Sequence, residues 1–112
     1  MPYWQLFCHI IWATKGREPL LTSGIEAIVH DFLRAKAVAL GATVFALNGM
    51  PDHVHPVVAV PPKIALAKFI GQIKAVAATR FNKSAISQTP LFWQEEYGLF
   101  SFDGKRLPNY VD

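Results

Sequence analysis

The sequence predicts a small α+β fold of the ferredoxin-like, split βαβ type, with an antiparallel sheet and two helices on one face. Two stretches carry apolar residues at helical spacing, and the stretches around them are rich in β-branched and aromatic residues. Along the chain these stretches alternate as strand, helix, strand, strand, helix, strand. The 112 residues contain no internal repeat, so a single domain over residues 1–112 is expected.

Composition limits the classes of protein to consider. Hydrophobic residues make up 52% of the chain and the net charge is +3, which excludes a disordered tail and favours an anionic partner only weakly. The single cysteine, Cys8, excludes an intramolecular disulfide and fits a reducing compartment. No apolar run approaches the roughly 20 residues that a membrane-spanning helix needs. We therefore expect a cytoplasmic protein with no membrane partner.

The first strand and the first helix follow from local pattern. Residues 3–14 are aromatic and β-branched with little charge, as in a central strand that is buried on both faces. His9 is expected to pack in the core, and the alternative is that it approaches the histidines described below. Residues 23–26 match a capping box, so a helix should begin there, with Ser23 as the cap, and end at Gly41.

A hairpin is predicted next, with a strand over residues 42–47, a turn over residues 48–52 and a return strand from His53. His53 and His55 project to the same face of such a strand and supply half of a metal site. The alternative is one partly buried ring at a sheet edge and one solvated ring. Pro56 cannot donate a backbone hydrogen bond, which indicates an edge strand, a bulge or a local distortion.

A second amphipathic helix is predicted from Lys63 to Asn82. No acidic residue lies between Asp52 and Glu95, so this part of the chain is more basic than the net charge implies. Its cations are either an ordinary solvated face or a surface that contacts nucleic-acid phosphates. The candidate DNA-binding residues are Lys63, Lys68, Lys74, Arg80 and Lys83.

The C-terminal part is predicted to hold a polar linker over residues 84–90 and one or two short strands over residues 91–102. Tyr97, within that strand region, is expected to be structural. Residues 107–112 have the pattern of a first helical turn, in which Tyr110 lies.

With these segments identified, the chain resembles the single-tyrosine transposases of the HUH superfamily, in the branch that includes the transposase-like proteins associated with repetitive palindromes. The matching segments occur in the family's order and span nearly the whole chain. They are residues 9–15, 17–21, 48–55, 68–74 and 92–101.

The resemblance implies a homodimer that binds single-stranded or hairpin DNA and cuts one strand through a 5′-phosphotyrosine link. His53 and His55 would bind a divalent metal, Mg²⁺ or Mn²⁺, which polarises the scissile phosphate. Tyr110 is the candidate nucleophile. The family places a metal-binding glutamine four residues after its tyrosine, and this sequence stops at Asp112. We therefore expect a domain that lacks most of the catalytic helix and has impaired cleavage. The alternative is a non-catalytic module that binds single-stranded nucleic acid.

Overall fold

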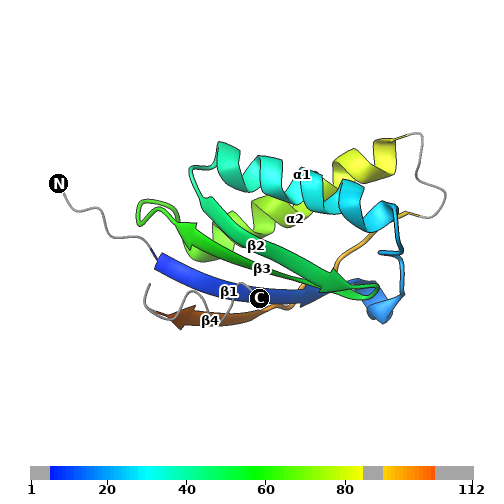
Figure 1. The fold of residues 1–112 in the computed structure, drawn as a ribbon, viewed down its shortest axis with the longest axis horizontal. Helices are drawn as coiled ribbons and strands as arrows, with labels where there is room; N and C mark the ends of the chain where they lie inside the picture. Colours follow the sequence, from blue (N-terminus) through cyan, green and yellow to red (C-terminus); the bar gives the residue numbers. More distant parts are fainter. Residues whose placement is uncertain (1–5, 85–89, 103–112) are drawn as a thin grey trace.

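The computed structural model describes residues 6–84 and 90–102, and it confirms the predicted ferredoxin-like α+β fold. The described strands form one antiparallel sheet in the order β2-β3-β1-β4, so β1 is an inner strand as predicted (Figure 1). The elements in chain order are β1 (Leu6–Ala13), the 3-10 turn η1 (Lys15–Arg17), α1 (Ile25–Ala39), β2 (Thr43–Met50), β3 (His53–Val60), α2 (Leu66–Lys83) and β4 (Gly98–Phe102).

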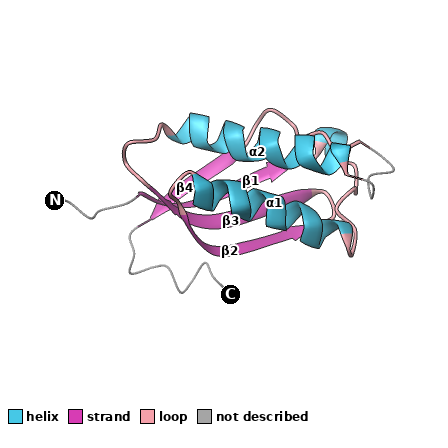
Figure 2. Ribbon diagram, turned by 90° about the horizontal axis from the view of Figure 1, so that it is seen from above, coloured by secondary structure: helices cyan, strands magenta, loops and turns pink. Residues whose placement is uncertain are grey.

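Both helices cover the same face of the sheet and lie side by side (Figures 1 and 2). The core forms between them and the sheet because each strand directs alternate side chains toward the helices. Burial of each large apolar side chain there contributes roughly 1.5–3 kcal/mol to stability. Large buried core residues include Ile10, Trp12 and Val54 of the strands and Val29, Leu33, Phe69, Ile70 and Ile73 of the helices.

The start of α1 differs from the prediction. Ser23 does not cap this helix, because the N-cap is Gly24, which has a φ of 91° and no side-chain hydrogen bond. The amide of Glu26 instead donates to the backbone carbonyl of Thr22 at 2.8 Å. The predicted end is confirmed, since Gly41 has a φ of 92° and its amide donates to the helix.

Pro56 lies in an inner strand, so the prediction that its strand is at the edge of the sheet was wrong. β3 pairs with both β2 and β1, and Pro56 is buried opposite Leu47 of β2. The predicted irregularity does occur, but it lies in β2, where the register shifts between Val44 and Ala46. The proline ring therefore adds apolar surface to the core from an inner strand, near Leu33 and Ile73.

Neither helix of the described residues is long and apolar enough to cross a membrane.

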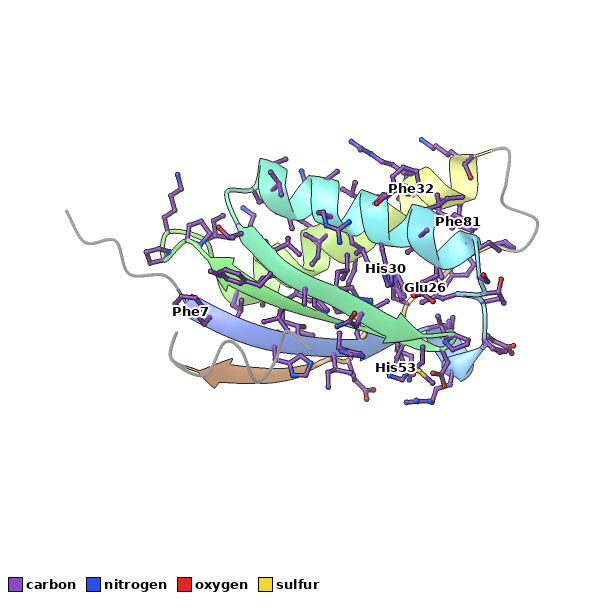
Figure 3. The ribbon with its side chains drawn as sticks, in the orientation of Figure 1. Phe7, Glu26, His30, Phe32, His53 and Phe81 are labelled. Carbon is purple, nitrogen blue, oxygen red and sulfur yellow. The ribbon has the colours of Figure 1, made fainter. Side chains whose placement is uncertain are left out.

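His30 of α1 is a buried titratable group and generates a prediction about stability. It lies between α1 and the sheet, only 7% exposed, and its Nε2 has no hydrogen-bond partner among the described residues (Figure 3). Burial lowers the pKa of His30, an effect that the nearby carboxylate of Glu26 offsets in part. The unfolded chain therefore takes up this proton first as the pH falls, which destabilises the folded state.

We predict that the free energy of unfolding decreases as the pH falls below about 6.5, the ordinary histidine pKa. His30→Met removes the titrating group and keeps the site apolar, so this variant should lose less stability than the wild type. Urea unfolding at about pH 7.5 and about pH 5.5 measures both losses. Equal losses for the two proteins would contradict a role for His30.

Candidate active site

The face of the sheet away from α1 and α2, here called the distal face, carries the two histidines of the hairpin. Val54 and Val58 of β3 are buried in the core beneath the helices. Because side chains alternate along a strand, His53 and His55 project from the distal face. Figure 3 shows His53 on this side of the sheet, whereas His30 lies on the helical side.

Three imidazoles form a row on the distal face. The ring centroids of His53 and His55 are 5.8 Å apart, and their planes lie at 27° to each other. The ring of His9, from β1, is 5.6 Å from that of His55. The expectation that His9 packs in the core was wrong, since it is half-buried beside the pair, as the alternative interpretation proposed. Local pattern could not decide this point because the contact depends on the register of β1 against β3.

Asp52 orients the ring of His53. A carboxylate oxygen of Asp52 lies 2.7 Å from His53 Nδ1, and the other oxygen accepts a hydrogen bond from Arg17 Nε at 3.2 Å. The hydrogen bond with His53, together with the charge of Arg17, lowers the pKa of Asp52. An ionised carboxylate only accepts, so Nδ1 of His53 is the donor and Nε2 is the ring nitrogen left for another partner. Metal-binding histidines are commonly oriented in this way.

His55 is in the neutral form that binds metals. Burial lowers the pKa of His55, and the neighbouring rings of His9 and His53 lower it further. Its imidazole is therefore neutral at pH 7 and does not repel a cation. Among the residues that the structure describes, no group of three or more His, Cys, Asp or Glu side chains is arranged to hold a metal ion. His53 and His55 are thus two residues that could hold a metal, and the described part of the chain places no third side chain of these types with them.

A buried threonine fixes the segments around Asp52. Thr14, at the end of β1, is fully buried, and its hydroxyl donates to the carbonyl of Glu18 at 2.6 Å. The amide of Thr14 donates to the carbonyl of Asp52 at 2.9 Å. Thr14 therefore ties the η1 turn to the β2–β3 turn. As a result Arg17 and His53, which are far apart in the sequence, both reach Asp52.

A hollow of about 390 Å³ lies beside His53 and is called the cleft below. The η1 turn and β3 each contribute to its wall, and the segment before β4 contributes most of the polar groups. Ring, amide and carboxylate groups thus surround a space next to the histidine pair. The cleft is lined by Arg17, His53, Gln94, Glu96 and Tyr97, together with residues 11–13 and Gly98.

The prediction that Lys74 lies on an exposed basic face was wrong. It is 8% exposed, and its Nζ donates to the carbonyl of Gln94 at 2.6 Å while lying 5.8 Å from the ring centroid of Trp12. In return, Trp93 Nε1 donates to the carbonyl of Lys74 at 2.9 Å. Burial lowers the pKa of Lys74, against the opposing effect of Glu95. Lys74 therefore fastens the segment that lines the cleft to α2.

The other basic residues of this region remain exposed. Lys63, Lys68, Arg80 and Lys83 belong to α2 or to the segment before it, in the helical layer. Lys63 and Lys68 line a separate hollow of about 220 Å³. The structure thus does not bring these cations together with the histidine pair, which projects from the distal face. Tyr110 lies outside the described residues.

Comparison with known proteins agrees with this arrangement. Residues 2–112 match the family described as "Transposase IS200 like". The chain is 34% identical over 77 residues to the ISDra2 transposase TnpA of Deinococcus radiodurans, which covers 69% of this chain and 55% of that protein. The chain therefore spans about half the length of this curated relative.

Two solved structures share the fold. The crystal structure of a protein from Deinococcus radiodurans R1 that is assigned as a transposase has a TM-score of 0.79 and 25% identity, over 97% of this chain and 90% of that one. The REP-associated tyrosine transposase, solved with a REP hairpin, has a TM-score of 0.68 and 13% identity. That match covers 99% of this chain and 66% of the other, and at this identity it bears on the fold alone.

The position of Lys74 predicts an unequal response of two lysines of α2. Lys74→Met keeps the aliphatic stem but removes the ammonium group that the Gln94 carbonyl accepts from, so we expect a loss of about 1–3 kcal/mol in the free energy of unfolding. Lys68→Met, on the exposed surface, should change stability by less than about 0.5 kcal/mol. Urea unfolding at neutral pH compares the two variants. Similar effects would contradict the role assigned to Lys74.

Proposed function

Because this chain belongs to the family of IS200-like transposases, we propose that it binds single-stranded DNA and cuts it by transferring a phosphate to a tyrosine. The observation that carries this proposal is the pair of adjacent imidazoles at His53 and His55, with the Asp52 carboxylate on the Nδ1 side of His53. Such a pair fits a divalent metal that holds a scissile phosphate.

The two imidazoles fit a divalent metal that accepts nitrogen ligands. His53 would bind through Nε2 and His55 through a ring nitrogen, while the Asp52 carboxylate orients the ring of His53 through its hydrogen bond with Nδ1. Imidazole nitrogens suit transition metals better than Mg²⁺, which prefers oxygen ligands, so Mn²⁺ is the better probe of this site. When bound, the metal would neutralise negative charge that develops on the phosphate oxygens.

In the proposed reaction a tyrosine oxygen forms a bond to the scissile phosphorus, and the bond from phosphorus to the 3′ oxygen breaks. The tyrosine loses its proton, and the leaving oxygen becomes a 3′ hydroxyl. The product is a 5′-phosphotyrosine, whose bond energy is available for rejoining to another 3′ hydroxyl. We assign the nucleophile to Tyr110 on the resemblance to the family. Tyr97 lines the cleft with His53 and is the alternative that the test below separates.

The DNA partner is proposed to be single-stranded or folded as a hairpin, and the protein is proposed to act as a homodimer. The solved relative with a REP hairpin supports a hairpin ligand in this fold. The exposed cations Lys63, Lys68, Arg80 and Lys83 would contact the DNA backbone away from the histidine pair.

Metal binding supplies the first test of this proposal. His53→Ala and His55→Ala should each weaken Mn²⁺ binding by about tenfold or more, because each removes one of the proposed ligands. Asp52→Asn should weaken it by about tenfold, because the carboxylate that orients His53 is lost. Titration of Mn²⁺ followed by electron paramagnetic resonance of the free ion measures these changes. His30→Met is the control. Unchanged Mn²⁺ binding in both histidine variants, His53→Ala and His55→Ala, would reject the site.

Adduct formation supplies the second test. A labelled single strand incubated with the protein and Mn²⁺ should give a covalent complex that survives denaturing electrophoresis. Tyr110→Phe should abolish this complex, and Tyr97→Phe should retain it. The opposite result would assign the nucleophile to Tyr97. DNA binding without any adduct would support the non-catalytic module instead.

A further inference from the structure

The cleft beside His53 contains the cation of Arg17, which the proposed chemistry does not use, and the ring of Tyr97, which that chemistry includes only as the alternative nucleophile. Arg17 and Tyr97 both line it, and the side chain of Arg17 is 61% exposed, so its guanidinium is open to solvent. We propose that this cleft binds the nucleotide next to the scissile phosphate, with Arg17 on its phosphate group and Tyr97 stacked on its base. This inference rests on the proposed function and adds a binding subsite to it.

The geometry of Arg17 suits a phosphate contact. Its Nε donates to Asp52 Oδ2 at 3.2 Å, and this same carboxylate contacts His53. A guanidinium carries five N–H donors, so this bond leaves the paired donors at its end available for a phosphate. Asp52 therefore holds the cation of Arg17 and the ring of His53 next to each other. In this proposal one phosphate of the strand lies at the histidine pair and the next lies at Arg17.

The backbone of Arg17 is held in an uncommon conformation. Its φ is 56°, in the left-handed region that residues other than glycine seldom adopt. The amide of Arg17 donates to the carbonyl of Thr14 at 2.9 Å, and Thr14 is itself buried and tied to Asp52. The surrounding hydrogen bonds thus impose this conformation. Strained residues of this kind gather at functional sites, where the strain positions a side chain.

Tyr97 supplies a surface for a base. It is 39% exposed and stands in the cleft near Gln94 and Glu96. Every nucleobase has a flat face, so an exposed ring binds single strands with little sequence preference. The carboxylate of Glu96 disfavours a phosphate at its own position but accepts hydrogen bonds from the amino groups of bases. This distribution of charge favours the phosphate near Arg17 and the base near Tyr97.

The test measures DNA binding by fluorescence anisotropy, in EDTA so that the result is independent of metal. The probe is a labelled single strand of mixed sequence, about 16 nucleotides long, titrated between about 50 and about 200 mM salt. Arg17→Gly accepts the positive φ, so it removes the side chain without adding backbone strain. We expect about tenfold weaker binding at low salt and a salt slope smaller by about 0.7, the value for one phosphate contact on a single strand.

Arg34→Gln is the matched control for this charge. Arg34 is also exposed and paired with an aspartate, Asp31, at 3.4 Å, but it lies on α1 in the helical layer. It should keep the wild-type slope. An unchanged slope in Arg17→Gly, or the same decrease in Arg34→Gln, would overturn the proposal.

Tyr97→Leu should weaken binding by about tenfold while leaving the salt slope unchanged, because stacking involves no counterion release. Tyr97→Phe should bind as the wild type does. Phe92→Leu is the control, since Phe92 is 58% exposed but does not line the cleft. Equal binding by Tyr97→Leu and the wild type would overturn the assignment of the base. Failure of the wild type itself to bind the strand would instead refute the proposed function.

Discussion

The arrangement of the candidate site depends on the carboxylate of Asp52 and on the buried threonine that fixes its backbone. Asp52 contacts His53 through one oxygen and Arg17 through the other, while its carbonyl accepts from the amide and hydroxyl of Thr14. One residue of a turn thereby joins the end of β1, the η1 turn and the start of β3. Because the hydroxyl of Thr14 is buried, loss of both its acceptors, the carbonyls of Glu18 and Asp52, would leave it unsatisfied, which makes the connection specific as well as stable.

The opposite side of the cleft depends on a second buried polar contact. The side chain of Lys74 is buried together with its ammonium group, and burial of an unpaired charge is costly. The carbonyl of Gln94 and the ring of Trp12 compensate for this cost, and Trp93 bonds back to the carbonyl of Lys74. The segment before β4 pairs with the end of β1 only through a short bridge at Trp93, so the contacts with Lys74 add to the few backbone bonds that position it. The wall that carries Tyr97 is therefore held by both α2 and the end of β1.

The sequence predicted the order of the elements because periods of 3.6 and 2 residues are local properties. The same period of 2 placed His53 and His55 on one face. The position of His9 beside them depends on the register between two strands, which no local pattern encodes. Lys74 occupies the border of its helical stripe, and only the tertiary contact with Gln94 decides that it is buried. Ser23 matched a capping box, yet a backbone carbonyl and Gly24 formed the helix start instead.

The helical face of the sheet carries the core, and the distal face carries the histidines of the candidate site. The core residues of β3, such as Val54 and Val58, face the helices, so the histidines that alternate with them are not needed to fill that core. A strand can therefore carry two imidazoles with little loss of apolar packing, provided that their polar atoms find partners at the other face. Asp52 is such a partner for His53. This division also explains why the cations of α2 lie apart from the histidines: a helix that packs on one face of a sheet cannot direct its side chains through the strands to the other.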